Sequence, residues 1–279
     1  MKLALIQQHA TSDKSANVAR GLDAVDRAAA AGASVAVFAE LAFERFHPQQ
    51  PAKGGVLDLA EPVPGPTTQA FSARAKRHGM VIVLNLYERD GTDAYDCSPV
   101  IDADGRLLGR TRMVHITDYA CFHEQGYYTP GDTGAPVYDT RAGRIGVAIC
   151  YDRHYPEYMR ALAVAGADLV VVPQAGAVGE WPEGLYEAEM QVAAFQNGYY
   201  VALCNRVGPE ECLTFGGESF VCAPNGQVIA RAPAAEDTIL YSDVDLSSAE
   251  RSHARRLFLR DRRPELYADW VQPKVGARS

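Results

Sequence analysis

The stretch that decides the fold is Gly-Arg-Ile-Gly-Val-Ala-Ile-Cys-Tyr-Asp-Arg-His-Tyr-Pro-Glu, residues 143–157. Residues 145–150 read as a buried strand because apolar and β-branched side chains run together, and Pro156 suits the first turn of a helix. This arrangement places Cys150 at a sheet edge, beside free backbone N–H groups and the positive end of a helix dipole. That position favours both a thiolate and an oxyanion, although an isolated cysteine is more often a small buried hydrophobe. Cys150 is therefore a candidate nucleophile that needs support from the rest of the chain.

The same alternation of strand and helix extends outward from this segment. Spacing and composition predict four helices, over 13–31 with Ser12 as the N-cap, 66–77, 156–165 and 184–197. Apolar runs predict strands over 2–8, 34–38, 80–86, 94–101, 106–112, 145–150, 169–173, 199–205, 218–223 and 227–230. Because hairpins mix with helix crossovers, and two similar halves follow each other, we expect an α/β fold of two helix-covered sheets packed together. The length fits a single domain over 1–279.

The composition is that of a globular protein that acts on a small molecule. Apolar residues make up 47% and charged residues 22%, which is enough for a packed core. A formal charge of −8 provides no basic patch, so nucleic acid is a poor partner. Without a signal segment or a bilayer-spanning run, we expect a cytoplasmic protein with no membrane contact. The six cysteines form no CxxC pair and the histidines show no ligand spacing, so we expect no metal, no other cofactor and no disulfide framework.

Two further segments supply acidic and polar side chains. Val-Ala-Val-Phe-Ala-Glu (35–40) is a predicted strand that ends at Glu40, and α/β enzymes place their sites at the carboxyl edge of a sheet. The alternative for Glu40 is a solvated acid on a loop. Between residues 112 and 132 lies a long loop region rich in His, Glu and Tyr, which is typical of binding sites beside a rigid sheet.

The chain carries, in order, a strand-end glutamate, Gly-Arg-Thr-Arg-x-x-His, Thr-Pro-Gly-Asp and Ile-Cys-Tyr-Asp-Arg-His-Tyr-Pro-Glu, at residues 40, 109–115, 129–132 and 149–157. This pattern resembles the nitrilase, or carbon-nitrogen hydrolase, superfamily, from residue 2 to about residue 245. The resemblance implies a four-layer α-β-β-α sandwich with two mixed sheets. It also implies that Glu40 is the general base, that Cys150 is the attacking thiol, and that Glu124 helps to position substrate and nucleophile.

The resemblance breaks at the lysine of the family's Glu-Lys-Cys triad, because Met113 stands where the family reads Arg-Lys-x-His. Methionine can neither carry charge nor donate a hydrogen bond, and no lysine lies between residues 77 and 273. Strand alternation turns Arg110 and Arg112 away from the face of Met113, so an arginine could take over only through a bulge. Losing a charged oxyanion donor costs on the order of a hundredfold to a thousandfold in turnover. We therefore expect an impaired enzyme.

Three explanations of Met113 stay open: an engineered replacement of lysine, a natural member that binds without turnover, and a natural enzyme with an altered catalytic set. The retention of Glu40, Glu124 and Cys150 favours the first. In the binding-module alternative, the fold keeps its ligand and has lost its chemistry.

The implied mechanism is hydrolysis through a covalent intermediate, in which Glu40 takes the thiol proton and the Tyr151 N–H helps to hold the oxyanion. Segments 150–156, 204–208 and 215–219 look most like the N-carbamoyl amine and β-ureidopropionase branch. A substrate carboxylate would suit Arg153, with His154 as a second contact, although Arg153 serves equally well in a structural ion pair.

Aliphatic amides and nitriles stay open as substrates, because one catalytic set serves all of them. A papain-like protease is disfavoured because its cysteine lies near the chain start, and a glutaminase because no His-x-Glu follows Cys150.

The C-terminal tail, residues 251–279, is rich in arginine, with six in the thirteen positions 251–263. Such a charge run is typical of a solvated surface or a subunit contact. The family resemblance implies a homodimer or larger homo-oligomer, in which this tail is a candidate contact.

Overall fold

Two β-sheets form the centre of the structure, a computed structural model that describes residues 1–271. The first sheet has the order β15-β1-β2-β3-β5-β4, with β6 paired to β5. Its strands are β1 (Lys2–Gln7), β2 (Val35–Phe38), β3 (Val81–Val83), β4 (Leu86–Asp90), β5 (Asp93–Ile101), β6 (Leu107–Arg112) and β15 (Thr238–Asp243). Strands β1, β2 and β3 run parallel and the others antiparallel, so the sheet is mixed.

The second sheet is mixed in the same way and has the order β14-β13-β10-β9-β8-β7. Its strands are β7 (Val137–Thr140), β8 (Gly143–Val147), β9 (Leu169–Gln174), β10 (Tyr200–Asn205), β13 (Phe220–Cys222) and β14 (Val228–Arg231). Strands β8, β9 and β10 are parallel. A separate hairpin joins β11 (Val207–Pro209) to β12 (Thr214–Gly216).

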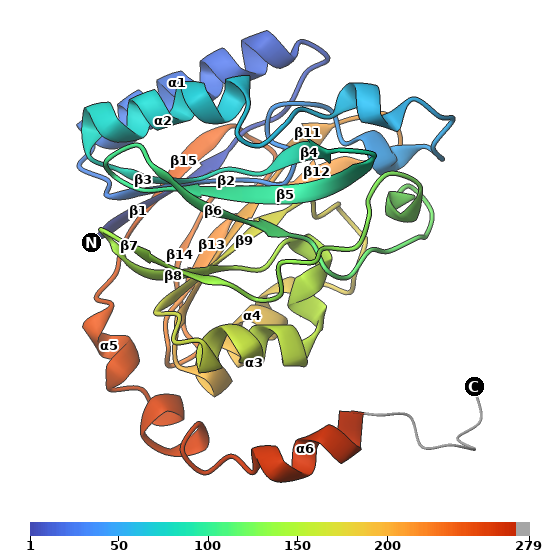
Figure 1. Cartoon of the computed structure of the whole chain (residues 1–279). Coiled ribbons are helices and arrows are strands. Elements are labelled where there is room, and N and C mark those ends of the chain that lie inside the picture. Colours follow the sequence, from blue (N-terminus) through green and yellow to red (C-terminus); the bar gives the residue numbers. More distant parts are fainter. Residues whose placement is uncertain (272–279) are drawn as a thin grey trace, which may run out of the picture.

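Helices cover the outer face of each sheet, so the predicted four-layer α-β-β-α sandwich is confirmed (Figure 1). Helices α1 (Lys14–Ala30) and α2 (Pro66–His78) lie on the first sheet, and α3 (Pro156–Val164) and α4 (Leu185–Asn197) on the second. Two short α-helices follow the last strand, α5 (Ser247–Glu250) and α6 (Pro264–Val271), with a π-helical turn over Ala254–Phe258 between them. None of the helices within residues 1–271 has the length and apolarity needed to cross a membrane.

Side chains alternate between the two faces of a strand, so a single strand contributes to two different hydrophobic cores. In β1, Leu3 and Leu5 belong to the core between the sheets, whereas Ala4 and Ile6 belong to the core under α1 and α2. Successive side chains of a strand point to opposite faces, so buried strands such as these must be apolar on both sides. This explains the continuous apolar runs in the sequence.

Strands β7, β11, β12 and β15 were not predicted, and three predictions that bear on the site or on α1 were wrong. The strand predicted over 80–86 is broken at Leu84 and Asn85, although β3 and β4 pair with β5 in one register. The strand predicted over 145–150 ends at Val147, because the backbone turns sharply before Cys150. Helix α1 is capped by Asp13 instead of Ser12, since the Asp13 side chain accepts from the N–H three residues later.

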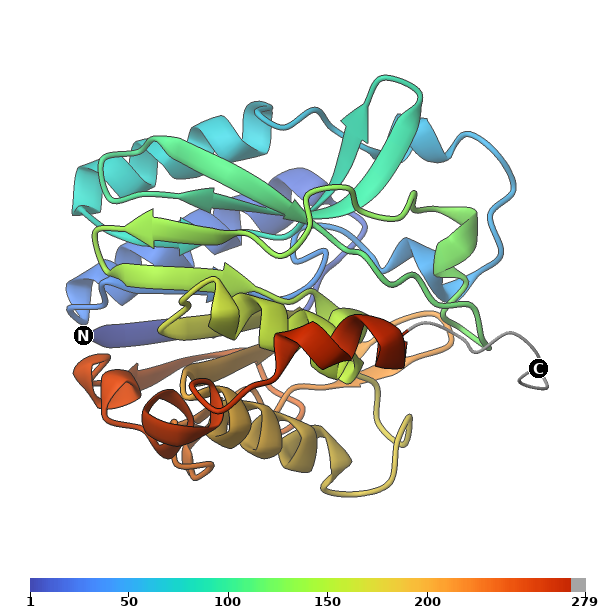
Figure 2. The ribbon, with the colours of Figure 1, turned by 60° about the horizontal axis from the view of Figure 1, so that its bottom comes forward.

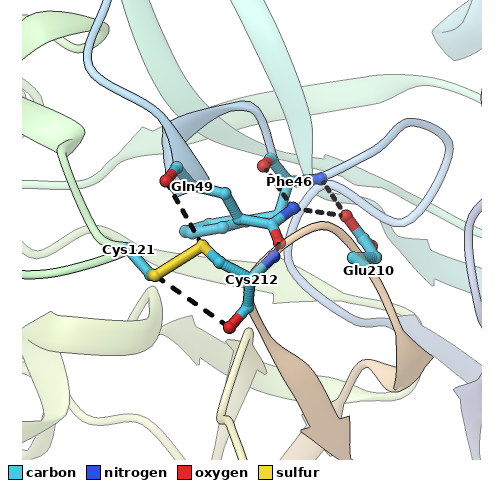
Figure 3. The surroundings of a disulfide bond; sticks show 5 residues. All are labelled: Phe46, Gln49, Cys121, Glu210 and Cys212. Carbon is cyan, nitrogen blue, oxygen red and sulfur yellow. Dashed lines mark hydrogen bonds between the residues drawn. A yellow bond between two sulfur atoms is a disulfide. The ribbon is translucent and has the colours of Figure 1, made fainter.

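The cysteines are only partly as expected. Four are free and buried, namely Cys97, Cys150, Cys204 and Cys222. Cys121 and Cys212 instead form a disulfide across 91 residues of sequence, so the expectation that the cysteines would stay unpaired was wrong for these two (Figure 3). Gln49 accepts from the Cys212 N–H and donates to Glu210, which fastens the surrounding loops. The fold brings the loop before Glu124 against the β11–β12 hairpin, and no local pattern could reveal that proximity.

The described part of the tail lies outside the α3 and α4 layer (Figures 1 and 2). Two of its rings pack against Phe195 of α4: Phe258, with ring centroids 5.5 Å apart, and His253, with ring centroids 6.5 Å apart. In α6, Trp270 is 67% exposed. Residues 272–279 of the predicted tail contact lie outside the described residues.

Candidate active site

The candidate nucleophile and base lie at the carboxyl ends of two strands that belong to different sheets. Glu40 lies two residues beyond β2, and Cys150 lies three residues beyond β8. The Glu40 carboxyl, whose two oxygens are buried without a hydrogen-bond partner, lies close enough to the Cys150 thiol for each group to shift the pKa of the other, so the two ends meet between the sheets. Leu41 and Cys150 both have a φ of 42°, a conformation that costs a non-glycine residue on the order of 1–3 kcal/mol.

The backbone after Glu40 is held by buried polar side chains that offset this strain. Asn85 Oδ1 accepts from the Leu41 N–H at 2.7 Å, and Arg206 donates to the Glu40 carbonyl oxygen at 2.8 Å. Asn85 Nδ2 in turn donates to Asp96 Oδ1 at 2.5 Å. The break between β3 and β4 thus places Asn85 where it links the base to Asp96.

Three buried carboxyl groups, Glu40, Asp96 and Glu124, lie close together, and Glu40 and Glu124 also lie near the thiol. Burial and the neighbouring Glu124 raise the pKa of Glu40 to about 8. Burial, followed by the charge of Glu40, raises the pKa of Asp96 well above its usual range, and burial with Asp96 does the same for the pKa of Glu124. The cluster therefore holds protons at neutral pH, where isolated carboxyl groups would have lost them.

Burial also raises the pKa of the Cys150 thiol well above its usual range, and the charges of Glu40 and Glu124 add to this effect. The expectation that the helix terminus would favour a thiolate was therefore wrong. The loss of water around Cys150, a residue that is 4% exposed, outweighs the dipole of a short helical turn. Cys150 needs a base to react, and Glu40 lies beside it.

Met113 lies in the same packed cluster as Cys150 and is 1% exposed. Its N–H donates to the Asp96 carbonyl oxygen at 2.9 Å, and its own carbonyl accepts from the Gly131 N–H at 2.7 Å. A Cβ on Gly131 would come within 2.3 Å of the Arg112 carbonyl oxygen, so only glycine allows this close approach. The Thr-Pro-Gly-Asp motif thus fastens the segment that carries position 113.

Asp152 ties the same segment to the Cys150 turn. Its Oδ1 accepts from the N–H groups of Val114 at 3.2 Å and His115 at 3.0 Å, and lies 2.7 Å from His115 Nδ1. The His115 ring stacks on Tyr155 with centroids 3.4 Å apart. These contacts fix the separation between positions 113 and 150.

The neighbouring arginines take part in ion pairs elsewhere. Arg112 pairs with Glu88 and Asp132, and Arg110 pairs with Glu88 and Asp90. These contacts agree with the expectation that neither arginine replaces the family lysine.

The three residues predicted to contact substrate follow Cys150 directly. The Arg153 side chain is 1% exposed and donates to the Cys150 carbonyl oxygen and to Gln174 Oε1, both at 3.0 Å. Its Nε lies 3.4 Å from the carboxylate of Glu189 in α4, so Arg153 takes part in the structural ion pair that was the alternative to substrate binding. His154 Nδ1 lies 2.6 Å from the same carboxylate. Tyr151 packs edge-on against His154, with centroids 5.0 Å apart.

Sequence reasoning missed a second acidic group near the thiol, on the loop after β9. The Glu180 carboxylate accepts from the hydroxyls of Tyr119, at 2.5 Å, and Tyr186, and from the Ala177 N–H at 3.0 Å. Its charge contributes to the raised pKa of Cys150, which reflects their proximity. A pocket of about 540 Å³ borders this loop and is lined in part by Trp181 and Tyr186. The density of aromatic and acidic residues in this loop was the available signal.

Sequence reasoning also missed Asp96, Asp152 and Gln174. Each is fully buried, and each contacts the site through a neighbour distant in sequence. Within residues 1–271, no three His, Cys, Asp or Glu side chains are grouped to hold a metal ion.

The four-layer sandwich, with a buried thiol and carboxyl groups at facing strand ends, defines a hydrolase of the nitrilase superfamily. The carbon-nitrogen hydrolase family profile matches residues 2–254, and the chain belongs to this family. It is thus an amidohydrolase by family, acting on C–N bonds other than peptide bonds.

Curated relatives support this placement. An N-carbamoylputrescine amidase of Solanum lycopersicum is 35% identical over 95% of this chain and 93% of its own length. A citrullinase of Francisella tularensis is 31% identical over 98% of both chains. The β-ureidopropionase of Arabidopsis thaliana is 35% identical over 76% of this chain and 56% of its own length.

Solved structures agree on the fold. A carbon-nitrogen hydrolase from Helicobacter pylori has a TM-score of 0.90 and 28% identity, with 98% of both chains covered. A mutant amidase from Nesterenkonia sp. has a TM-score of 0.82 and 27% identity, covering 97% of this chain and all of that one. In that amidase, acrylamide has added to the active-site cysteine.

Proposed function

We propose that this chain hydrolyses an N-carbamoyl amine, with Cys150 as nucleophile and Glu40 as general base. The observation that carries the proposal is the placement of the Glu40 carboxyl, buried and without a hydrogen-bond partner, beside the buried Cys150 thiol. Because the thiol pKa is raised by burial, attack requires removal of the proton as the bond forms, and Glu40 is the group in reach.

The reaction then has two halves. Glu40 takes the proton of Cys150, the sulfur attacks the carbamoyl carbon, and the Tyr151 N–H receives the developing oxyanion. Glu40 returns the proton to the departing amine as the C–N bond breaks, leaving an S-carbamoyl group (a thiocarbamate) on Cys150. A water molecule, deprotonated by Glu40, attacks this carbamoyl carbon, the C–S bond breaks, and the proton returns to the thiol. The carbamic acid released decomposes to ammonia and carbon dioxide. Glu124 lies beside the base and maintains its raised pKa, which suits a group that must both accept and return a proton.

Charge around the thiol favours a substrate with a distal ammonium group over one with a carboxylate. Arg153, the expected carboxylate clamp, is buried and bonded within the protein. Glu180 instead presents a carboxylate held by two tyrosine hydroxyls on the loop beside the site. A charge-assisted contact to an ammonium group is worth about 1.5–3 kcal/mol, enough to select substrates by charge. The N-carbamoylputrescine amidases among the relatives are consistent with this substrate class.

Met113 supports a second candidate, a ligand-binding member without turnover, because the family's cation is replaced by a thioether. Small amides and nitriles also stay open as substrates for the same thiol. A cytoplasmic location and a homo-oligomeric assembly remain predictions.

The test is a panel of N-carbamoyl amines, N-carbamoyl amino acids, short amides and nitriles, each assayed for ammonia release and, by mass spectrometry, for an adduct on Cys150. We expect an adduct and slow ammonia release with amine-bearing carbamoyl compounds, and neither with Cys150→Ala. Turnover that persists in Cys150→Ala would refute the nucleophile. Binding of these compounds without any adduct would favour the binding module.

A further inference from the structure

Gln174, the last residue of β9, contacts the candidate nucleophile directly. Its side chain is fully buried, and Nε2 donates to Cys150 Sγ at 3.2 Å. Strands β8 and β9 are parallel neighbours, so their carboxyl ends deliver Cys150 and Gln174 to the same place. Asn205, at the end of β10, accepts from the Gly176 N–H at 2.7 Å and so holds the loop that follows Gln174.

The orientation of the Gln174 amide is dictated by Arg153. A guanidinium group has only donors, so the atom that receives the Arg153 Nη1 bond at 3.0 Å must be the amide oxygen. The amide NH₂ group therefore faces the sulfur. The same Nη1 donates to the Cys150 carbonyl oxygen, so one buried cation positions both the turn and the donor.

We propose that Gln174 is a further catalytic residue, which donates to the Cys150 sulfur as it becomes a thiolate and so takes part of the place of the cation missing at position 113. Arg153 acts through Gln174 as a positioning residue, and its charge polarises the amide toward the sulfur. This inference rests on the proposed role of Cys150 as nucleophile.

The charges around the sulfur explain why such a donor matters. The carboxyl groups of Glu40, Glu124 and Glu180 disfavour a negative charge on the Cys150 sulfur, whereas the positive charge of Arg153 favours it. The charged and titratable groups that face Cys150 are Glu40, Glu124, Arg153, Glu180, Tyr119 and Tyr186. Met113 carries no charge that could favour a thiolate. The Gln174 N–H, by contrast, already donates to the Cys150 sulfur.

The first variant is Gln174→Glu. It has the same size and keeps an acceptor for Arg153, with which it forms an ion pair, but it replaces the donor at the sulfur with a negative charge. Because that charge disfavours a thiolate by itself, the uncharged Gln174→Met separates the two roles: a purely structural role for Gln174 predicts that Gln174→Met reacts with acrylamide like the unaltered protein. Catalytic donation predicts that the thiol becomes harder to ionise, since a hydrogen bond to the charged form has been removed.

The measurement is the rate of acrylamide addition to Cys150 across a range of pH, followed by mass spectrometry on the full-length protein. Addition needs the sulfur as thiolate but needs no hydrolysis. We expect Gln174→Glu to slow addition about tenfold or more at neutral pH and to move the pH dependence upward by about one pH unit. Gln174→Met, which removes the donor without adding charge, is expected to slow it by a smaller factor.

Gln125→Glu is the matched control, because Gln125 is exposed and its side chain donates to the Ile116 carbonyl oxygen, not to the sulfur. Addition at an unchanged rate in either Gln174→Glu or Gln174→Met would overturn the inference. If Gln174→Glu fails to fold, Gln174→Met decides by the same criterion. A silent substrate panel together with a shifted addition profile would refute the proposed function and leave the role of Gln174 standing.

Discussion

Replacing Met113 with lysine is expected to raise turnover by about three to four orders of magnitude at pH 7. Two effects contribute. A charged donor restored to the oxyanion is worth on the order of 10²–10³ in turnover. The ammonium group would also lower the pKa of Glu40, which now lies at about 8, so that roughly a tenth of the base is ionised at pH 7. Full ionisation adds a factor of about ten.

The second factor gives the prediction its signature. At about pH 9, Glu40 is mostly ionised in both proteins, so the advantage of Met113→Lys should shrink about tenfold from its value at pH 7. The assay is kcat/KM for ammonia release from an N-carbamoyl amine at both pH values. Met113→Gln is the control, because it supplies a donor of similar size without charge.

A gain smaller than tenfold at pH 7 would refute the reasoning, since neither contribution would then be present. A large gain that stays constant between the two pH values would keep the oxyanion role and refute the effect on Glu40. An equal gain in Met113→Gln would show that donation, without charge, is what position 113 lacks.

Three further outcomes follow from the same geometry. The pKa of Glu40 is raised from 4.5 to about 8, so its contribution to stability is complete below about pH 4.5 and is lost as the pH rises through 8. The expected fall in the free energy of unfolding is on the order of 5 kcal/mol. Denaturant unfolding at about pH 5 and pH 9 measures this fall, and an equal free energy of unfolding at both pH values would contradict it. Asp96→Ala removes the side-chain group that lowers the pKa of Glu40, so the acidic limb of acrylamide addition should move to higher pH, whereas the exposed Asp93→Ala on the same strand should leave it in place. Glu180→Gln should lower kcat/KM about tenfold to a hundredfold for amine-bearing carbamoyl substrates and leave uncharged ones nearly unaffected, with the exposed Glu183→Gln as control; an equal loss for both substrate types would rule out recognition of charge.

The sequence predicted what depends on local spacing. Continuous apolar runs and helical periodicity located the central strands of both sheets and the helices that cover them, because a strand buried on both faces and a helix buried on one leave distinct local patterns. The edge strands β7 and β15, which are only partly buried, were missed. The short motifs around Glu40 and Cys150 placed both side chains at strand ends. The irregular positions were missed, as at Asn85, where a buried amide interrupts the strand to satisfy polar neighbours from other segments.

By itself, then, the sequence determined the α/β sandwich, the family, and the pair of side chains proposed to carry the chemistry, including the loss of the cation at Met113. Only the tertiary structure decided that Asp96 and Gln174 touch that pair, that Arg153 is engaged within the protein, and that Cys121 meets Cys212. It also decided the protonation of the site. Burial and the approach of like charges set a pKa, and both depend on which distant strands the fold brings together, a quantity that no local spacing contains.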